Sequence, residues 1–161
     1  MIKFLLRRIM VGDKFPDITL PIYHQDKIQI TQLKALTQGQ PHLFIGHPGA
    51  FTVLTTTKQI PDYIEANIQV PIVLWSVNDP FVIRKYAQKY KIPFSIICDY
   101  NGELTRLLEL GLSEENFFSF CCIRTLCLVK DSVVFGVSTE LNVEYTKSTK
   151  PEMAKHLLKV I

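Results

Sequence analysis

The sequence contains little of what marks specialised protein classes. Its 161 residues include only 7 glycines and 9 prolines, without a repeating pattern, which excludes collagen-like and low-complexity chains. The formal net charge is only +3, well short of the concentrated basic charge that a nucleic-acid-binding surface needs. The apolar run at positions 4–6 stops at Arg7 and is too short for a signal-peptide core or a membrane span. We therefore expect neither a nucleic-acid partner nor a membrane partner.

Cysteine is also scarce and poorly spaced for metal binding. The four cysteines, Cys98, Cys121, Cys122 and Cys127, form no C-x-x-C pair, and no histidine lies at ligand spacing from them. We expect no metal, no cofactor and no disulfide framework. Such thiols suit a reducing compartment, so the expected location is the cytoplasm. The alternative is the mitochondrial matrix, because the first residues are basic and contain no acid. Residues 1–9 are predicted to be a short N-terminal extension.

Hydrophobic residues, by contrast, are abundant at 47% of the chain, enough for a sizeable core in one domain spanning 1–161. Apolar runs and turn residues predict strands that alternate with helices and end in a hairpin. This order indicates an α/β protein with a mixed sheet. The strands are expected near 18–20, 28–30, 42–46, 70–75, 94–98, 123–129 and 133–137. Helical segments are expected at 31–36, from 55 onward, and at 79–90, 103–110 and 151–160.

Several local signals define the expected ends of these elements. Thr56 and Gln59 fit a capping box, so a helix is predicted to begin there, with Pro61 in its first turn or at a kink. Asp79 is expected to cap the next helix, with Pro80 in its first position. Gly111 is expected to end the helix that starts near residue 103. Residues 42–46 are predicted to form the central strand.

The segment Pro48-Gly49-Ala50-Phe51-Thr52-Val53-Leu54-Thr55-Thr56 resembles the active-site loop of peroxiredoxins. The similarity is to the type II, or atypical, branch, whose pattern is P-G-A-F-T-P-x-C-S/T. Further matches follow in family order, so the likeness spans roughly residues 10–161 and is far more specific than a single short motif. They are residues 11–16, Pro61, residues 76–82, Asp99 with Asn101-Gly102, and Arg124 with Leu126, Leu128, Val129 and Asp131.

The resemblance implies a thioredoxin-like fold, in which helices flank a mixed central sheet, and a thiol-peroxidase ancestry. In that family a cysteine thiolate attacks the O–O bond of a peroxide and becomes sulfenic acid. A helix N-terminus and a nearby arginine favour the thiolate by lowering its pKa. The resemblance assigns the supporting roles to Pro48, which shields the site, to Thr52, which orients the peroxide, and to Arg124.

The nucleophile itself is missing, because Thr55 occupies the position of the peroxidatic cysteine. A hydroxyl has neither a sulfenic acid state nor an accessible anion near neutral pH, so the supporting groups cannot replace the sulfur. Val53 replaces the loop proline and Gln59 the family's histidine. The position of an internal resolving cysteine falls near Ser148. We therefore expect this chain to be inactive as a standard peroxidase.

Three hypotheses follow. The first is a non-catalytic binding, regulatory or assembly partner that forms a homodimer or a heterodimer with an active paralogue. The second is a peroxidase that uses a relocated nucleophile, Cys121 or Cys122, in a loop near Arg124, and then needs a small thiol or a thioredoxin-type reductant. The third keeps the pocket as a small-anion site formed by Arg124 and the helix N-terminus. The aromatic stretch at 117–120 is expected in the core, or alternatively at a dimer contact.

Overall fold

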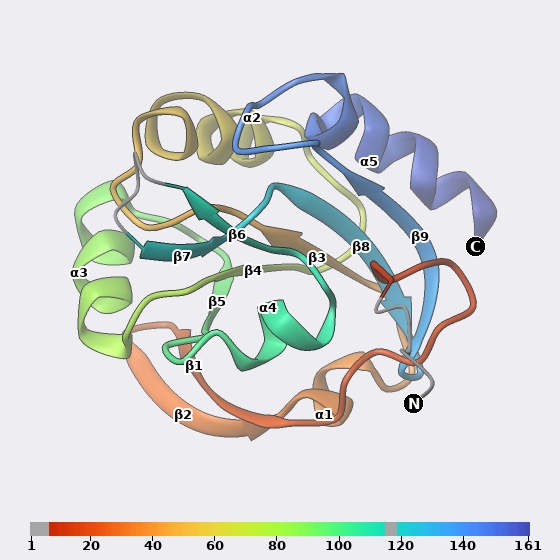
Figure 1. Cartoon of the computed structure of the whole chain (residues 1–161), viewed down its shortest axis with the longest axis horizontal. Helices are drawn as coiled ribbons and strands as arrows, with labels where there is room; N and C mark the ends of the chain where they lie inside the picture. The colour runs from red at the N-terminus through yellow and green to blue at the C-terminus, as the bar shows by residue number, and fades with distance from the viewer. Residues whose placement is uncertain (1–6, 115–118) are drawn as a thin grey trace, which may run out of the picture.

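In a computed structural model of this chain, seven strands form one twisted sheet. Figure 1 shows this sheet with the helices around it. The structure describes residues 7–114 and 119–161. The strands of the main sheet are β1 (Thr19–His24), β2 (Lys27–Gln32), β3 (His42–Gly46), β4 (Ile72–Ser76), β5 (Ser95–Cys98), β8 (Thr125–Lys130) and β9 (Val133–Thr139). Two further strands, β6 (Gly111–Glu114) and β7 (Ser119–Cys122), form a separate antiparallel pair.

The sheet order is β2-β1-β5-β4-β3-β8-β9. Strands β3, β4 and β5 run parallel, whereas the pairs at both sides of them are antiparallel. The middle strand is β4, and β3, which was expected to be central, is its neighbour. The predicted α/β class with a mixed sheet is confirmed. Because β3, β4 and β5 are parallel, their carboxyl ends lie at the same end of the sheet, where the loop after β3 begins.

Helices cover both faces of this sheet, as side-chain alternation along the strands requires. The helical segments are α1 (Leu33–Thr37), the π-helix η1 (Thr55–Gln59), α2 (Ile60–Glu65), α3 (Pro80–Tyr90), α4 (Glu103–Leu107), the 3-10 helix η3 (Lys147–Thr149), α5 (Pro151–Leu157) and the 3-10 helix η4 (Leu158–Val160). One core cluster joins Leu43, Ile45 and Leu74 to α2, α3 and α5. The other joins Phe44 and Trp75 to α1, α4 and the β6–β7 pair.

Two hairpin turns form, and the one between β8 and β9 is the predicted terminal hairpin. Gln25 and Asp26 connect β1 to β2, and Asp131 and Ser132 connect β8 to β9, all four with positive φ. Two consecutive residues with positive φ match the right-handed twist of paired strands. Asp79 caps α3 as predicted, since its carboxylate accepts hydrogen bonds from the backbone N–H groups of the next turn.

The prediction that Gly111 ends a helix is wrong. Helix α4 ends at Leu107, and Glu109 adopts the left-handed conformation there, with φ of 54°. Gly111 instead opens β6, where a Cβ atom would lie only 2.1 Å from the Phe120 ring. The glycine is therefore required by a close tertiary approach and not by a turn.

The predictions for residues 1–6 and for Phe117 and Phe118 concern residues outside the described ranges. Within the described ranges, no helix combines the length and the apolar character that crossing a bilayer requires. Among the same residues, no group of three or more His, Cys, Asp or Glu side chains is placed to hold a metal ion.

Candidate functional site

The loop after β3 is fixed by close contacts at both of its ends. A Cβ atom on Gly46 would lie 2.6 Å from the Trp75 ring, so only glycine allows β3 to run this close to Trp75. On the far side of Pro48, the Ala50 N–H donates to Asn78 Oδ1 at 2.9 Å. Phe51 then turns the chain with φ of 63°. These contacts hold the P-G-A-F-T segment against the carboxyl end of β4.

The helix that follows begins earlier than the capping-box prediction placed it. Val53 and Leu54 are already helical, and the carbonyl of Thr52 accepts from the Thr56 N–H at 3.0 Å. Neither Thr56 nor Gln59 forms the predicted reciprocal cap, so that prediction is wrong. Thr52 precedes the first turn instead, and its hydroxyl lies 2.7 Å from the Thr55 hydroxyl and 2.8 Å from the Gly49 carbonyl oxygen.

An unusual helical turn follows, and Pro61 provides a physical reason for it. Proline has no N–H to donate, and its ring collides with the carbonyl one turn earlier, which disfavours a regular helix interior. The chain forms the π-helix η1 just before this proline, and the Ile60 N–H donates to the Thr55 carbonyl. A π-turn widens the helix and re-aims side chains. Both Thr55 and Gln59, at its two ends, face the protein interior and are fully buried.

Arg124 lies between β7 and β8 and reaches this buried turn. Its Nη1 donates to Thr55 Oγ1 at 2.8 Å and to Gln59 Oε1 at 2.5 Å, and its Nε donates to the Val143 carbonyl at 2.9 Å. The ring of Tyr145 lies 5.9 Å from the guanidinium carbon. The structure thus brings together three of the four predicted site residues, Thr52, Thr55 and Arg124, through hydrogen bonds.

Pro48, the fourth predicted residue, is buried at the start of the same loop. It precedes the turn that carries Thr52, and its ring has no polar group to join the hydrogen bonds. Its shielding role remains a prediction.

The electrostatics of this cluster are dominated by one buried cation. Arg124 is only 1% exposed, and its three hydrogen-bond acceptors are a hydroxyl, an amide and a backbone carbonyl, all uncharged. Burial lowers the pKa of Arg124 to about 10, against the opposing influence of Tyr145 and Glu140. The group is still protonated at neutral pH. A buried positive charge without a contacting anion favours negative charge in its neighbourhood.

Two further residues of the cluster carried weaker sequence signals. Gln59 was identified only as a departure from a family histidine, yet it is a direct partner of Arg124. His47 was not singled out at all. It is fully buried, and neither of its ring nitrogens has a hydrogen-bond partner within the described part of the chain. Burial and the nearby Arg124 charge lower the pKa of His47 to about 3, so the ring is neutral. The sequence feature that could have identified His47 is its position between a strand and Pro48-Gly49.

The four cysteines are all buried and carry no disulfide. Cys121 and Cys122 lie on strand β7, not in the loop where they were expected, because they pair with Leu112 and Gly111 of β6. Burial raises the pKa of Cys98 to about 12, and it raises the pKa values of Cys122 and Cys127 still further. These three thiols are therefore protonated at neutral pH.

Comparison with known proteins gives consistent matches over most of this chain. The family model described as "AhpC/TSA family" matches residues 11–137. Peroxiredoxin-2B of Arabidopsis thaliana is 30% identical over an alignment of 159 residues, which covers 92% of this chain and 98% of that protein. Peroxiredoxin-2C of Oryza sativa subsp. japonica is 34% identical over 161 residues, with the same two coverages.

Solved structures show the same fold. The antioxidant protein of Plasmodium falciparum, a 1-Cys peroxiredoxin, superimposes with a TM-score of 0.83 at 21% identity, covering 94% of this chain and 99% of that one. The reduced Prx3 of Vibrio vulnificus, solved with H2O2, has a TM-score of 0.80 at 22% identity, covering 92% and 99%. The predicted thioredoxin-like fold is confirmed.

Proposed function

This chain belongs to the AhpC/TSA family of peroxiredoxins, and we propose that it keeps the family's anion-favouring pocket with the Thr55 alcohol in place of the reactive thiol. The hydrogen bond of 2.8 Å from Arg124 Nη1 to Thr55 Oγ1 carries this proposal. It joins the two positions that the family resemblance assigns to the nucleophile and to its activating cation. A hydroxyl in this position cannot cycle through sulfenic acid, so the surrounding groups support binding and not turnover.

The proposed role is therefore that of a non-catalytic binding, regulatory or assembly partner within the peroxiredoxin lineage. We place the chain in the type II branch, which the loop sequence from Pro48 to Thr56 supports.

A Thr55→Cys variant tests the proposal directly. The new thiol would receive the hydrogen bond of Arg124, so its pKa is expected to fall at least about one pH unit below that of an exposed thiol. Thr57→Cys is the matched control, because Thr57 is exposed on the same helical turn and its hydroxyl donates to the Val53 carbonyl. The pKa values are measured from the pH dependence of alkylation.

Peroxide consumption completes this test. We expect no consumption by the natural chain, rapid single-turnover consumption by Thr55→Cys, and slow consumption by Thr57→Cys. Equal pKa values and equal peroxide rates for the two introduced thiols would contradict the proposal, because the pocket would then have no activating geometry.

A relocated nucleophile is the second candidate, and one observation favours Cys121 over Cys122. The Cys121 side chain is close enough to Arg124 to interact with its charge, whereas burial is the main cause that raises the pKa of Cys122. Against this candidate, Cys121 is only 2% exposed. Peroxide consumption by the natural chain that disappears in Cys121→Ser, and persists in Cys98→Ser, would replace the first proposal by this one.

We also propose that the chain forms a homodimer through the surface beside the pocket. Large apolar side chains are exposed on the loop and helix start, namely Phe51, Val53 and Leu54, and at the start of α3, namely Phe81. The hydrogen bond from Ala50 to Asn78 holds these two segments together. Sedimentation equilibrium is expected to show a dimer that Phe81→Lys dissociates. A natural chain that sediments as a monomer at all concentrations would contradict this proposal.

A further inference from the structure

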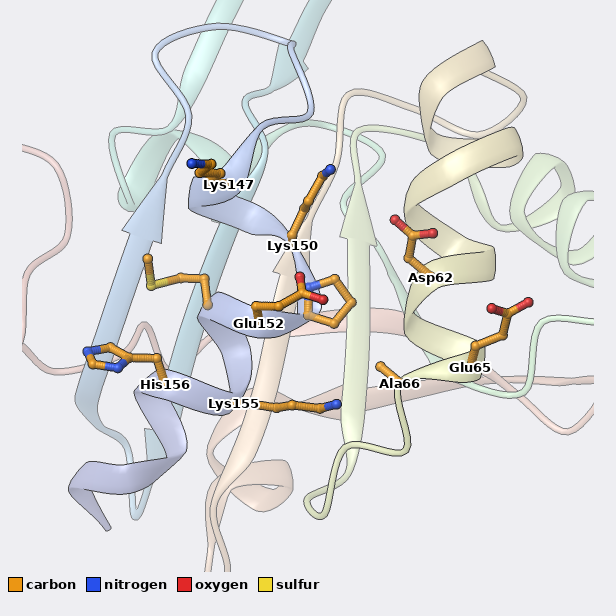
Figure 2. Close-up of a pocket in the computed structure, with 10 residues that line it drawn as sticks. Asp62, Glu65, Ala66, Lys147, Lys150, Glu152, Lys155 and His156 are labelled. Carbon is orange, nitrogen blue, oxygen red and sulfur yellow. The ribbon is translucent and has the colours of Figure 1, made fainter.

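A cleft lies away from the Thr55–Arg124 cluster, between α2 and the C-terminal segment of η3 and α5. Figure 2 shows this cleft, which has a volume of about 740 Å³. That size falls in the range of small-molecule sites. Its charged lining consists of Asp62, Glu65, Lys147, Lys150, Glu152, Lys155 and His156.

The cleft carries balanced charge of both signs. Three carboxylates and three ammonium groups line it, so its formal charge is zero with His156 neutral. Lys150, Glu152 and Lys155 point toward α2, from which Asp62 points back (Figure 2). None of these groups forms an ion pair within 4.0 Å, since the one ion pair found among the described residues joins Arg7 and Asp13.

The positions of the two sides are fixed by buried hydrogen bonds. The Tyr63 hydroxyl of α2 donates to the Thr149 carbonyl of η3 at 2.8 Å. The Thr149 hydroxyl in turn donates to the buried Glu140 carboxylate at 2.7 Å. Because the backbone spacing is held in this way, the charged side chains face each other across a preformed gap. Preformed sites bind ligands with a smaller ordering cost.

Individual side chains are also oriented on both sides. The Asp62 carboxylate accepts a hydrogen bond of 2.8 Å from the Tyr145 hydroxyl, and Lys150 Nζ lies 5.7 Å from the centre of the Tyr145 ring. Tyr145 thus holds one anion and one cation at the same end of the cleft. Each keeps hydrogen-bonding capacity for a further partner, since an ammonium has three donors and a carboxylate about four acceptor sites.

We propose that this cleft binds a small zwitterionic molecule of the amino-acid or short-peptide class, whose ammonium contacts Asp62 and whose carboxylate contacts Lys150 and Lys155. Charge-assisted hydrogen bonds at both ends are the strong kind. A polyanion meets three carboxylates in the same cleft, and a polycation meets three ammonium groups, so neither is matched. The inference does not depend on Thr55, because none of the pocket residues lines the cleft.

Titration of the isotope-labelled full chain with triglycine, followed by NMR, tests this proposal. Triglycine is expected to shift the amide signals of residues on both sides of the cleft, with saturation below about 10 mM. N-acetyltriglycine and triglycine amide, each lacking one terminal charge, are expected to bind at least about tenfold more weakly. Absence of saturating shifts, or equal binding of any capped peptide, would overturn the proposal.

Charge-removing variants locate the site within the same experiment. Asp62→Asn keeps an acceptor for Tyr145 while removing the charge, and Lys150→Gln removes the facing cation. Each is expected to weaken triglycine binding by about tenfold. Lys159→Gln is the matched control, because Lys159 is exposed on the same C-terminal segment and does not line the cleft. Unchanged affinity in both cleft variants would overturn the assignment, even if triglycine binds elsewhere.

Discussion

The cluster around Arg124 and the cleft between α2 and α5 both lie near Tyr145, and they differ in how far their charged groups are buried. The Tyr145 ring is 5.9 Å from the Arg124 guanidinium carbon and 5.7 Å from Lys150 Nζ. Arg124 is a single cation, buried and surrounded by uncharged acceptors. Lys150 is one of several exposed charges of both signs. The two cations therefore differ sharply in burial and in the groups that surround them.

Removing Arg124 and Lys150 in separate variants should give the largest difference in stability between these two regions. Arg124→Ala leaves a cavity and deprives Thr55, Gln59 and Val143 of a donor, so we expect a loss of about 3–5 kcal/mol in the free energy of unfolding. Lys150→Ala removes an exposed charge and should change it by less than about 0.5 kcal/mol. Urea denaturation measures both. Equal losses would contradict the contrast between the pocket and the cleft.

The pH dependence of stability should depend on His47. Its pKa is depressed from 6.5 to about 3 in the folded chain, so between these values the unfolded chain binds more protons. The stability linked to this neutral ring is fully present above pH 6.5 and is lost as the pH falls toward 3, by up to about 1.4 kcal/mol per pH unit. His47→Leu should remove this part of the slope.

His156→Leu is the control for that measurement, because His156 is exposed at the cleft. Urea denaturation at several pH values is expected to give the natural slope for this variant. An identical slope in His47→Leu would mean that the folded state does not hold the ring neutral.

The hydrogen bond from Arg124 to Gln59 should contribute less to the free energy of unfolding than the whole Arg124 side chain does. Gln59→Leu removes the acceptor of Arg124 Nη1 and leaves a buried charge less well solvated, which should cost about 1–3 kcal/mol. Glu65→Gln, an amide substitution at the exposed rim of the cleft, is the comparison. A stabilising Gln59→Leu, measured by urea denaturation, would show that this hydrogen bond does not support Arg124.

The smallest effects are expected in the cleft without a ligand. Lys155→Gln removes an exposed charge that forms no ion pair with any described residue, so stability should change by less than about 0.5 kcal/mol. A loss of several kcal/mol on thermal denaturation would indicate that this lysine supports the fold, and the comparison of pocket and cleft would then fail.

Much of the fold was predictable because its signals are local. The turn residues Gln25-Asp26 and Asp131-Ser132 specify hairpins, and Asp79-Pro80 specifies a helix start, through contacts within a few residues. Two local predictions failed, one of them because of a close tertiary approach. Gly111 was needed for the approach of Phe120, and the capping box of Thr56 gave way to a helix that begins at Val53.

The candidate site was predictable only in part. The loop sequence indicated Thr52 and Thr55, and family likeness indicated Arg124, but the sequence could not state their distances. His47 was missed because a single histidine beside a strand has no periodic signal. The β7 position of Cys121 and Cys122 was missed because it depends on pairing with Leu112 and Gly111 of β6.

The sequence by itself determined the alternation of strands and helices, the hairpin turns, and the presence of the Thr55 alcohol in a loop that resembles the peroxiredoxin active-site loop. Only the tertiary structure decided that Arg124 meets Thr55 across 69 residues of chain, that the ring nitrogens of His47 are buried without a hydrogen-bond partner among the described residues, and that opposite charges face each other across a cleft. The physical reason is the separation along the chain over which each kind of interaction acts. Backbone preferences and hydrophobic periodicity act between near neighbours, whereas burial and charge pairing depend on which distant segments pack together.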